Sequence, residues 1–138
     1  MTTTDPPKPI GIFLCERVLR DVLRPDSISC INMHNMMTVQ AFPAVLPLVF
    51  AYAEVTGSDQ DFTYQFKFVD RHGTELATSN IQRVSPLPNK YMTHKLIGAF
   101  QGLVFPQEGS YQLNLALDGK DVTNMAFQVL HFAPESSA

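Results

Sequence analysis

The segment FTYQFKFV, residues 62–69, constrains the fold of this chain more than any other part of the sequence. Phe62, Tyr64, Phe66 and Phe68 alternate with smaller or more polar residues. Successive side chains of a β-strand point to opposite faces, so this spacing places all four aromatic rings on one face. The segment therefore predicts a half-buried β-strand.

The same period-two alternation dominates the body of the chain, roughly residues 10–132. Asp118-Gly119 between two alternating segments is a strong short-range signal of a β-hairpin. DRHG at 70–73 supplies another turn, because its glycine can take positive φ. These patterns predict an all-β fold, a single antiparallel β-sandwich of about eight strands. The expected strands are residues 11–18, 27–35, 46–56, 62–69, 74–84, 96–105, 111–117 and 120–132.

Tyr111 adds a detail that is typical of immunoglobulin-like sandwiches. It stands two residues after Gly109, at the start of a predicted strand, and Leu113 occupies the place of the usual cysteine. In such domains the phenol of this tyrosine corner bonds back to upstream backbone. We therefore expect structural roles for Gly109, Tyr111 and the turn residue Gly119, with an ordinary core aromatic as the alternative for Tyr111.

The segment GIFLCERVLRD, residues 11–21, allows two interpretations. Its apolar residues from Val18 to Leu23 are spaced as in an amphipathic helix that ends before Pro25. However, the preceding IGIFLC is apolar and rich in β-branched residues, and SISCINM alternates on the far side of RPDS. We predict a strand at 11–18, followed by a connection with one short helical turn at most, near residues 19–24.

Length, charge and termini exclude several classes of protein. A chain of 138 residues fits one domain, and its net charge of −3 argues against a general nucleic-acid binder. No apolar run approaches the ~20 residues that span a bilayer. MTTTDPPKP lacks the layout of a secretory signal, so with two cysteines we expect the reduced cytoplasm. We expect a disordered leader at 1–9, a β-sandwich domain at 10–132 and a disordered tail at 133–138.

The residues with reactive side chains form no recognisable catalytic motif. A nucleophilic Cys15 or Cys30 would need a nearby histidine or a helix N-terminus to lower its pKa, whereas Glu16 acts in the opposite direction. A disulfide between the two is disfavoured by the compartment. The four histidines lack metal-ligand spacing, and no phosphate loop or nucleophile elbow is present. We expect no enzyme activity and no cofactor; Cys15, His34 and His72 are the least implausible catalytic groups.

Aspartates gather in the connections at one end of the predicted sandwich. If consecutive strands alternate in direction, the odd-numbered connections share an end, and clustered carboxylates there could bind Ca²⁺. Against this, aspartate is a favoured turn residue, and basic residues lie in the same connections. A Ca²⁺-binding or small-ligand-binding sandwich is therefore the alternative hypothesis. Its weak metal candidates are Asp26, Asp59, Asp61, Asp118 and Asp121.

The opposite end contains the longest apolar connection, HNMMTVQAFPAV at residues 34–45. Met36, Met37 and Phe42 exposed in a loop would form an adaptable protein-binding patch. The alternative is that these residues plug the end of the sandwich or extend a strand. We take the loop as the candidate surface of a non-enzymatic interaction or structural module. Its partner would be an unidentified protein or a second copy of the chain; no nucleic acid or membrane is expected.

The order of several motifs resembles a known family. LCERVLRD, SISCINM, FPAVLPLVFAYAEVTG, FVDRHGTEL and GLVFPQEGSYQLNLALDGKDV follow one another between residues 11 and 132. Together they look like an uncharacterised bacterial family of small single-domain proteins, a domain of unknown function. The resemblance implies a β-sandwich of bacterial origin, and it supplies no catalytic residue.

Overall fold

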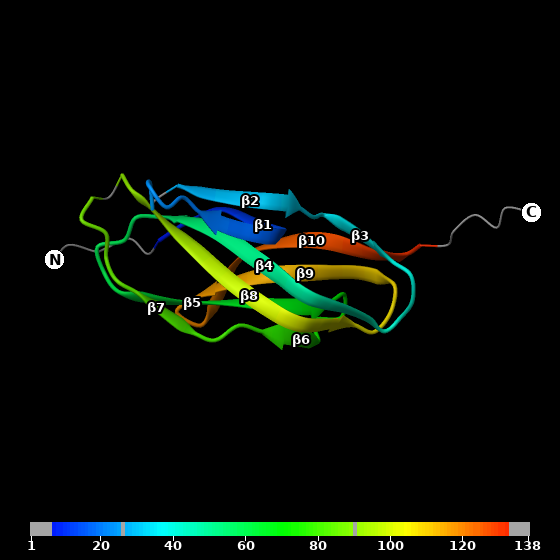
Figure 1. The fold of residues 1–138 in the computed structure, drawn as a ribbon. Helices are drawn as coiled ribbons and strands as arrows, with labels where there is room; N and C mark the ends of the chain where they lie inside the picture. Colours follow the sequence, from blue (N-terminus) through cyan, green and yellow to red (C-terminus); the bar gives the residue numbers. More distant parts are fainter. Residues whose placement is uncertain (1–6, 26, 90, 133–138) are drawn as a thin grey trace, which may run out of the picture.

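Two β-sheets packed face to face make up the computed structural model, which describes residues 7–25, 27–89 and 91–132 (Figure 1). The first sheet has the order β2 (Ile28–Met33), β1 (Pro9–Arg20), β4 (Ala44–Thr56), β8 (Thr93–Phe105). The second has the order β3 (Met36–Val39), β10 (Lys120–His131), β9 (Gly109–Leu117), β5 (Phe62–Asp70), β6 (Glu75–Thr78), and β7 (Gln82–Val84) also pairs with β5. The predicted β-sandwich is confirmed. The described residues form ten strands, where we expected about eight, and no helix.

The aromatic face of β5 forms the centre of the core, as its alternation predicts. Phe62, Tyr64, Phe66 and Phe68 are all buried between the sheets. The sheets are closely packed where Gly98 of β8 lies against Phe66, because a Cβ built on Gly98 would stand 2.7 Å from the phenylalanine ring. Close packing of rings against small residues therefore joins the two layers.

Topology and one side-chain contact identify the sandwich as immunoglobulin-like. Tyr111 at the start of β9 is buried, and its hydroxyl donates a hydrogen bond to the Gln107 carbonyl, four residues upstream. This is the contact that a tyrosine corner predicts. Leu113 is fully buried on the same strand. The short strand β3 crosses to the second sheet and pairs in parallel with β10, whereas β2 and β4 belong to the first sheet.

Both predicted turns are present. Asp118 and Gly119 have φ of 51° and 80°, the two positive values that a tight hairpin between β9 and β10 requires. In the DRHG turn, Gly73 has φ of 82°. The Asp70 carboxylate accepts hydrogen bonds from the backbone N–H groups of His72 and Thr74, which closes that turn.

The strand interpretation of residues 11–18 is confirmed, and the helical turn near 19–24 is not formed. β1 continues to Arg20, because Leu19 and Arg20 pair with Ser29 and Ile28 of β2. Beyond it, the Asp21 carboxylate accepts hydrogen bonds from the N–H groups of Leu23 and Arg24. These bonds close a local Asx turn in the connection between β1 and β2.

Two predicted boundaries differ in the structure. The expected strand 74–84 is split into β6 and β7. Between them, the side-chain hydroxyl of Ser79 accepts a hydrogen bond from the Phe66 N–H of β5. The expected leader ends earlier than residue 9, since Pro9 belongs to β1 and the Thr56 N–H donates to the Lys8 carbonyl. Residues 1–6 and the predicted tail at 133–138 lie outside the described residues.

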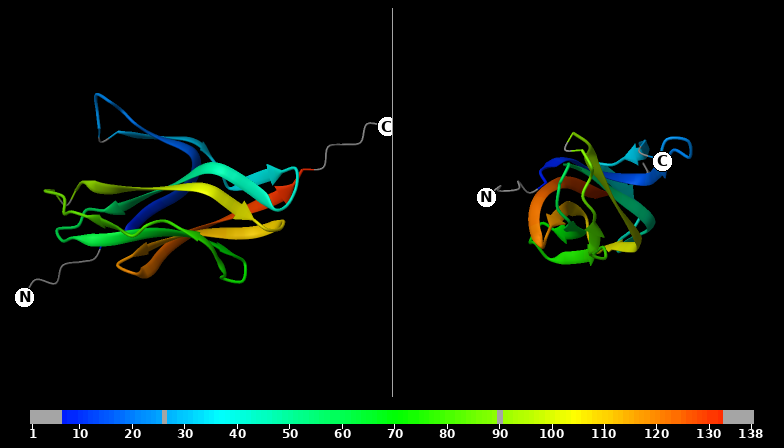
Figure 2. Two further views of the ribbon diagram at one scale, coloured as in Figure 1. Left: turned by 60° about the horizontal axis from the view of Figure 1, so that its bottom comes forward. Right: turned by 90° about the vertical axis from the view of Figure 1, so that its left-hand side faces the viewer.

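β1 changes its partner along its length. Its first half, to Cys15, pairs with β4, and its second half, from Cys15, pairs with β2. The β1–β2 hairpin therefore stands away from the body of the sandwich, as the blue loop shows in the left view of Figure 2. The described residues contain no helix long and apolar enough to cross a membrane.

Candidate functional site

The connection at residues 34–45, expected to be a loop, contains strand β3. Met36 and Val39 of β3 lie opposite Gln128 and His131 of β10 in a parallel register. The expectation of an open loop is therefore wrong, and the segment forms a separate short strand in the second sheet, where the alternative was a plug or a strand extension. Pairing with β10 covers backbone groups that would otherwise form an exposed sheet edge. Whether the segment binds a partner stays a prediction.

The three candidate residues of this segment have different surroundings. Met36 is 56% exposed, and its side chain is available to solvent. Met37 and Phe42 are half-buried and pack against the hydrophobic core. Only Met36 of the three is therefore free to change without disturbing the fold.

A largely apolar hollow of about 410 Å³ lies between β3 and β4. It is concave and mainly hydrophobic with a few polar groups, which is the usual character of a binding site. We call it the β3–β4 hollow. It is lined by Glu16, His34, Met36, Met37, Thr38, Val39, Leu46, Leu48 and Val49.

Glu16 supplies a negative charge to the wall of the β3–β4 hollow. The side-chain amide of Asn32 donates a hydrogen bond of 2.7 Å to its Oε2. His34, which also lines the hollow, is held by its backbone N–H, which donates to the Leu14 carbonyl at 2.7 Å. The arrangement can accept an apolar side chain and attract a positive group beside it.

Sequence reasoning found the part of the hollow that residues 34–39 supply and missed the part from β1 and β4. Leu46, Leu48 and Val49 come from β4, and Glu16 comes from β1. The signal was the run AVLPLVF at 44–50, which is apolar at both odd and even positions. A strand with one buried face needs apolar residues only at alternate positions, so this run indicates that both faces of β4 are covered or carry apolar surface.

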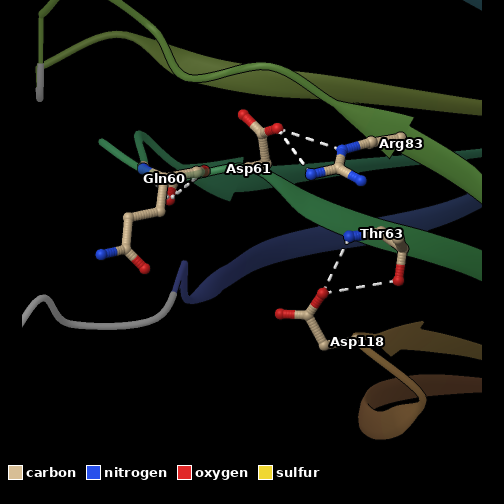
Figure 3. Close-up of polar contacts among 6 residues, drawn as sticks. Gln60, Asp61, Thr63, Arg83 and Asp118 are labelled. Carbon is tan, nitrogen blue, oxygen red and sulfur yellow. Dashed lines mark hydrogen bonds and ion pairs between the residues drawn. The ribbon is translucent and has the colours of Figure 1, made fainter.

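The aspartates at the other end do not converge on a shared centre (Figure 3). Asp61 forms an ion pair with Arg83, with Oδ2 and Nη2 2.9 Å apart. Asp118 instead accepts a hydrogen bond from the backbone N–H of Thr63 at 2.9 Å. Each carboxylate therefore stabilises its own turn or strand end.

The remaining candidate carboxylates do not complete a shared site among the described residues. Asp121 pairs with Lys67 at 3.5 Å, Asp59 is exposed, and Asp26 lies outside the described residues. Across the part of the chain that the structure describes, no group of three or more His, Cys, Asp or Glu side chains is placed to hold a metal ion. The geometry gives no support to a calcium site.

The thiols are not activated as nucleophiles. Cys15 is fully buried, burial raises its pKa to about 12, and its Sγ donates to the Phe50 carbonyl at 3.7 Å. Burial also raises the pKa of Cys30, which is half-buried. Both cysteines are unpaired. A thiolate is the reactive form, so neither residue has the environment of a catalytic cysteine.

The histidines do not form a common site either. His34 lines the β3–β4 hollow, while His72 lines a separate hollow beside Arg71. His94, which precedes the expected strand 96–105, belongs to β8 and is only 4% exposed. Its Nε2 accepts a hydrogen bond from Ser58 N–H at 3.1 Å, and its ring meets Phe62 edge to face. His94 therefore fastens the β4–β5 connection to β8.

A larger hollow of about 640 Å³ lies beside β7 and the start of β8. Its walls mix apolar groups with three cations, Arg20, Arg83 and Lys95. Two of these cations are already paired, Arg83 with Asp61 and Lys95 with Glu54. Two of the three positive charges in this hollow are therefore already neutralised by carboxylates of the same chain.

Comparisons with known proteins bear on the family and not on an activity. The sequence matches the profile of a family of unknown function, DUF6941, over residues 11–130. No curated protein matches it. Among solved structures it is similar to an immunoglobulin-like protein from Pseudomonas aeruginosa, with 11% identity and a TM-score of 0.40, covering 91% of this chain and 97% of that one.

A second solved structure is similar over part of its length. It is the alkylpurine DNA glycosylase AlkC of Pseudomonas fluorescens, bound to DNA containing an abasic site analog. The identity is 7%, the TM-score is 0.44, and the match covers 70% of this chain and 28% of the glycosylase. Neither similarity indicates a function for this chain.

Proposed function

The chain belongs to the family of unknown function DUF6941, and we propose that it is a non-enzymatic binding module that uses the β3–β4 hollow. The observation that carries this proposal is the apolar lining of the hollow, with Met36 56% exposed at its edge. Large exposed apolar groups gathered in a concavity mark interaction sites in soluble proteins. The raised pKa of Cys15 supports a role without thiol chemistry.

The lining also favours a partner of a particular chemistry. Methionine side chains are flexible and polarisable, so Met36 and Met37 can adapt to an apolar side chain that enters the hollow. Glu16 favours a basic group next to that side chain. We infer a protein partner that presents a bulky aliphatic residue near arginine or lysine. Two cysteines without a disulfide support a cytoplasmic setting, where thiols stay reduced.

The test compares two methionines that are similarly exposed and lie in different hollows. Met36→Glu places a charge in the β3–β4 hollow, whereas Met92→Glu places the same charge in the hollow beside β7, where Met92 is 43% exposed. Tagged wild type and both variants are used for affinity capture from native lysate with mass spectrometry. Circular dichroism and thermal melting check that the variants fold. Met37 and Phe42 are left unchanged, because they pack against the core.

We expect a partner that wild type and Met92→Glu retain and that Met36→Glu loses. Loss with Met92→Glu instead would move the binding surface to the larger hollow and contradict the proposal. Equal capture by all three proteins would also contradict it.

A further inference from the structure

The β3–β4 hollow lies along the outer edge of strand β3. All four residues of that strand, Met36–Val39, line the hollow, although their side chains alternate between exposed and half-buried positions. A hollow that touches the side chains of both faces of a strand borders its edge, and therefore its backbone. The other edge of β3 pairs in parallel with β10, which runs beside it in Figure 1.

The backbone of β3 directs hydrogen-bonding groups toward the hollow. The Asn35 and Val39 carbonyls accept hydrogen bonds of 3.1 and 2.6 Å from backbone N–H groups of β10 and its continuation. Backbone groups of successive strand residues point to opposite edges, so the N–H and C=O groups of Met36 and Thr38 point away from β10. Within the described part of the chain, β3 pairs with no other strand, and these four groups have no hydrogen-bond partner.

The opposite wall of the hollow is the part of β4 that β1 leaves unpaired. β1 pairs with β4 only as far as Phe50, whereas β8 continues along β4 to Ala44. Residues 44–49 therefore have one partner strand, and three apolar residues of this part line the hollow. Among the described strands, the hollow thus lies between two that each lack a second partner at this place.

Of these two edges, β3 is the better template for a further strand. Pro47 interrupts the open part of β4 and supplies no N–H. Proteins protect sheet edges with prolines and charged side chains, among other devices. β3 is short, but its sequence, MMTV, contains neither a proline nor a charge. The backbone of β3 is therefore open to pairing, and β4 supplies apolar packing.

We propose that the β3–β4 hollow receives an extended segment of a partner protein, which pairs with the outer edge of β3 as an additional strand. This inference rests on the proposed function, because it states how the partner occupies the same hollow. Main-chain hydrogen bonds to Met36 and Thr38 give affinity, and alternate side chains directed to the apolar lining give specificity. Glu16 in the wall favours a lysine or arginine in the segment.

The probe is a library of random linear peptides displayed on phage and selected on the immobilised full chain. Peptides that bind wild type and not Met36→Glu are synthesised, and their dissociation constants are measured by fluorescence anisotropy. We expect these peptides to carry aliphatic residues at alternate positions and a lysine or arginine. Met92→Glu, whose charge lies in the hollow beside β7, should bind them like wild type.

The substitution Thr38→Pro tests pairing through the backbone of β3. It removes an N–H that points away from β10, so the bonds between β3 and β10 are kept. Thr38→Val is the matched control, because it changes the exposed side chain and keeps the N–H. Thr38→Pro should bind the peptides at least about tenfold more weakly, whereas Thr38→Val should bind them like wild type. Thermal melting checks that both variants fold.

Methylation of the peptide backbone gives a test that does not depend on the fold of a variant. A strand presents every second N–H to one neighbour. Methyl groups on alternate peptide nitrogens should therefore abolish binding when they occupy the set that faces β3 and spare it when they occupy the other set. Equal binding of the two methylated peptides would overturn the proposal.

These outcomes are separable from failure of the proposed function. If the peptides depend on Met36 while Thr38→Pro binds them like wild type, the hollow is a binding surface that does not add a strand. If a lysate partner depends on Met36 and no selected peptide does, the hollow binds a folded surface, and strand addition is again contradicted. If neither a peptide nor a lysate partner distinguishes Met36→Glu from wild type, both proposals are contradicted.

Discussion

Cys15 and His94 show how burial decides the chemistry of single residues in this protein. Both side chains are reactive types, and both are almost completely covered. Burial disfavours the charged form, so it raises the pKa of Cys15 and lowers the pKa of His94. Each then acts as a neutral hydrogen-bonding group, Cys15 toward Phe50 and His94 toward Ser58. The sequence offered Cys15 as one of its least implausible catalytic groups, whereas its burial and hydrogen bond, like those of His94, are those of a structural residue.

His94 should make the stability of the fold depend on pH. Because burial lowers its pKa in the folded state below the ordinary 6.5, the unfolded chain takes up a proton first as the pH falls. Its stabilising contribution is therefore complete above that ordinary value and declines as the pH falls below it. We expect the free energy of unfolding to decrease between about pH 7 and pH 5, with a smaller decrease in His94→Gln.

Urea denaturation at several pH values measures this slope. His72→Gln is the control, because His72 is exposed and the one hydrogen bond described for its ring is with Arg71. It should keep the slope of the wild type. An unchanged slope in His94→Gln would contradict the role assigned to His94.

At the scale of elements, local signals predicted strands well and non-local pairing was missed. FTYQFKFV and the Asp118-Gly119 hairpin were predicted because alternation and turn chemistry lie within a few neighbouring residues. The strand Met36–Val39 was missed because its partner, β10, lies far along the chain and its parallel pairing leaves no local pattern. The hollow could not be predicted for the same reason, since β1, β3 and β4 supply its walls.

Gly98 in β8 tests how closely the two sheets are packed. A methyl group at this position would stand 2.7 Å from the Phe66 ring, which is closer than atoms in contact normally approach. Gly98→Ala should therefore lower the free energy of unfolding by about 1–3 kcal/mol, as overpacking of a core does. Denaturant unfolding of Gly98→Ala, Phe66→Leu and the double variant measures this as a double-mutant cycle.

The two substitutions should not be additive, because the smaller leucine leaves room for the new methyl group. The double variant is expected to lose less stability than the sum of the single variants. Strict additivity would show that a methyl group at position 98 and the Phe66 ring do not clash.

The connections at the aspartate-bearing end should not respond to calcium. Asp61, Asp118 and Asp121 are engaged with Arg83, the Thr63 backbone and Lys67, and they face separate partners. A ligand that binds only the folded state raises Tm, so millimolar CaCl₂ should leave Tm equal to that in MgCl₂ or in a chelator. A rise specific to calcium would revive the cation-binding hypothesis.

At the scale of the whole molecule, the β3–β4 hollow lies beside an immunoglobulin-like core. That core accounts for stability, and β1 extends beyond it where the strand leaves β4 to pair with β2. The same strand supplies Glu16 to the hollow. The features that a partner would contact are therefore additions to the sandwich, consistent with function residing in sites placed on a common fold.

The most direct measurement uses the methionine methyl groups as reporters in NMR. Wild-type protein, labelled with ¹³C at its methionine methyls, is titrated with the unlabelled partner captured from lysate. Met36 and Met37 line the hollow, whereas Met92 and Met125 lie elsewhere. The account predicts that the Met36 and Met37 signals shift while those of Met92 and Met125 do not. No shift at Met36 and Met37, or a shift confined to Met92, would contradict it.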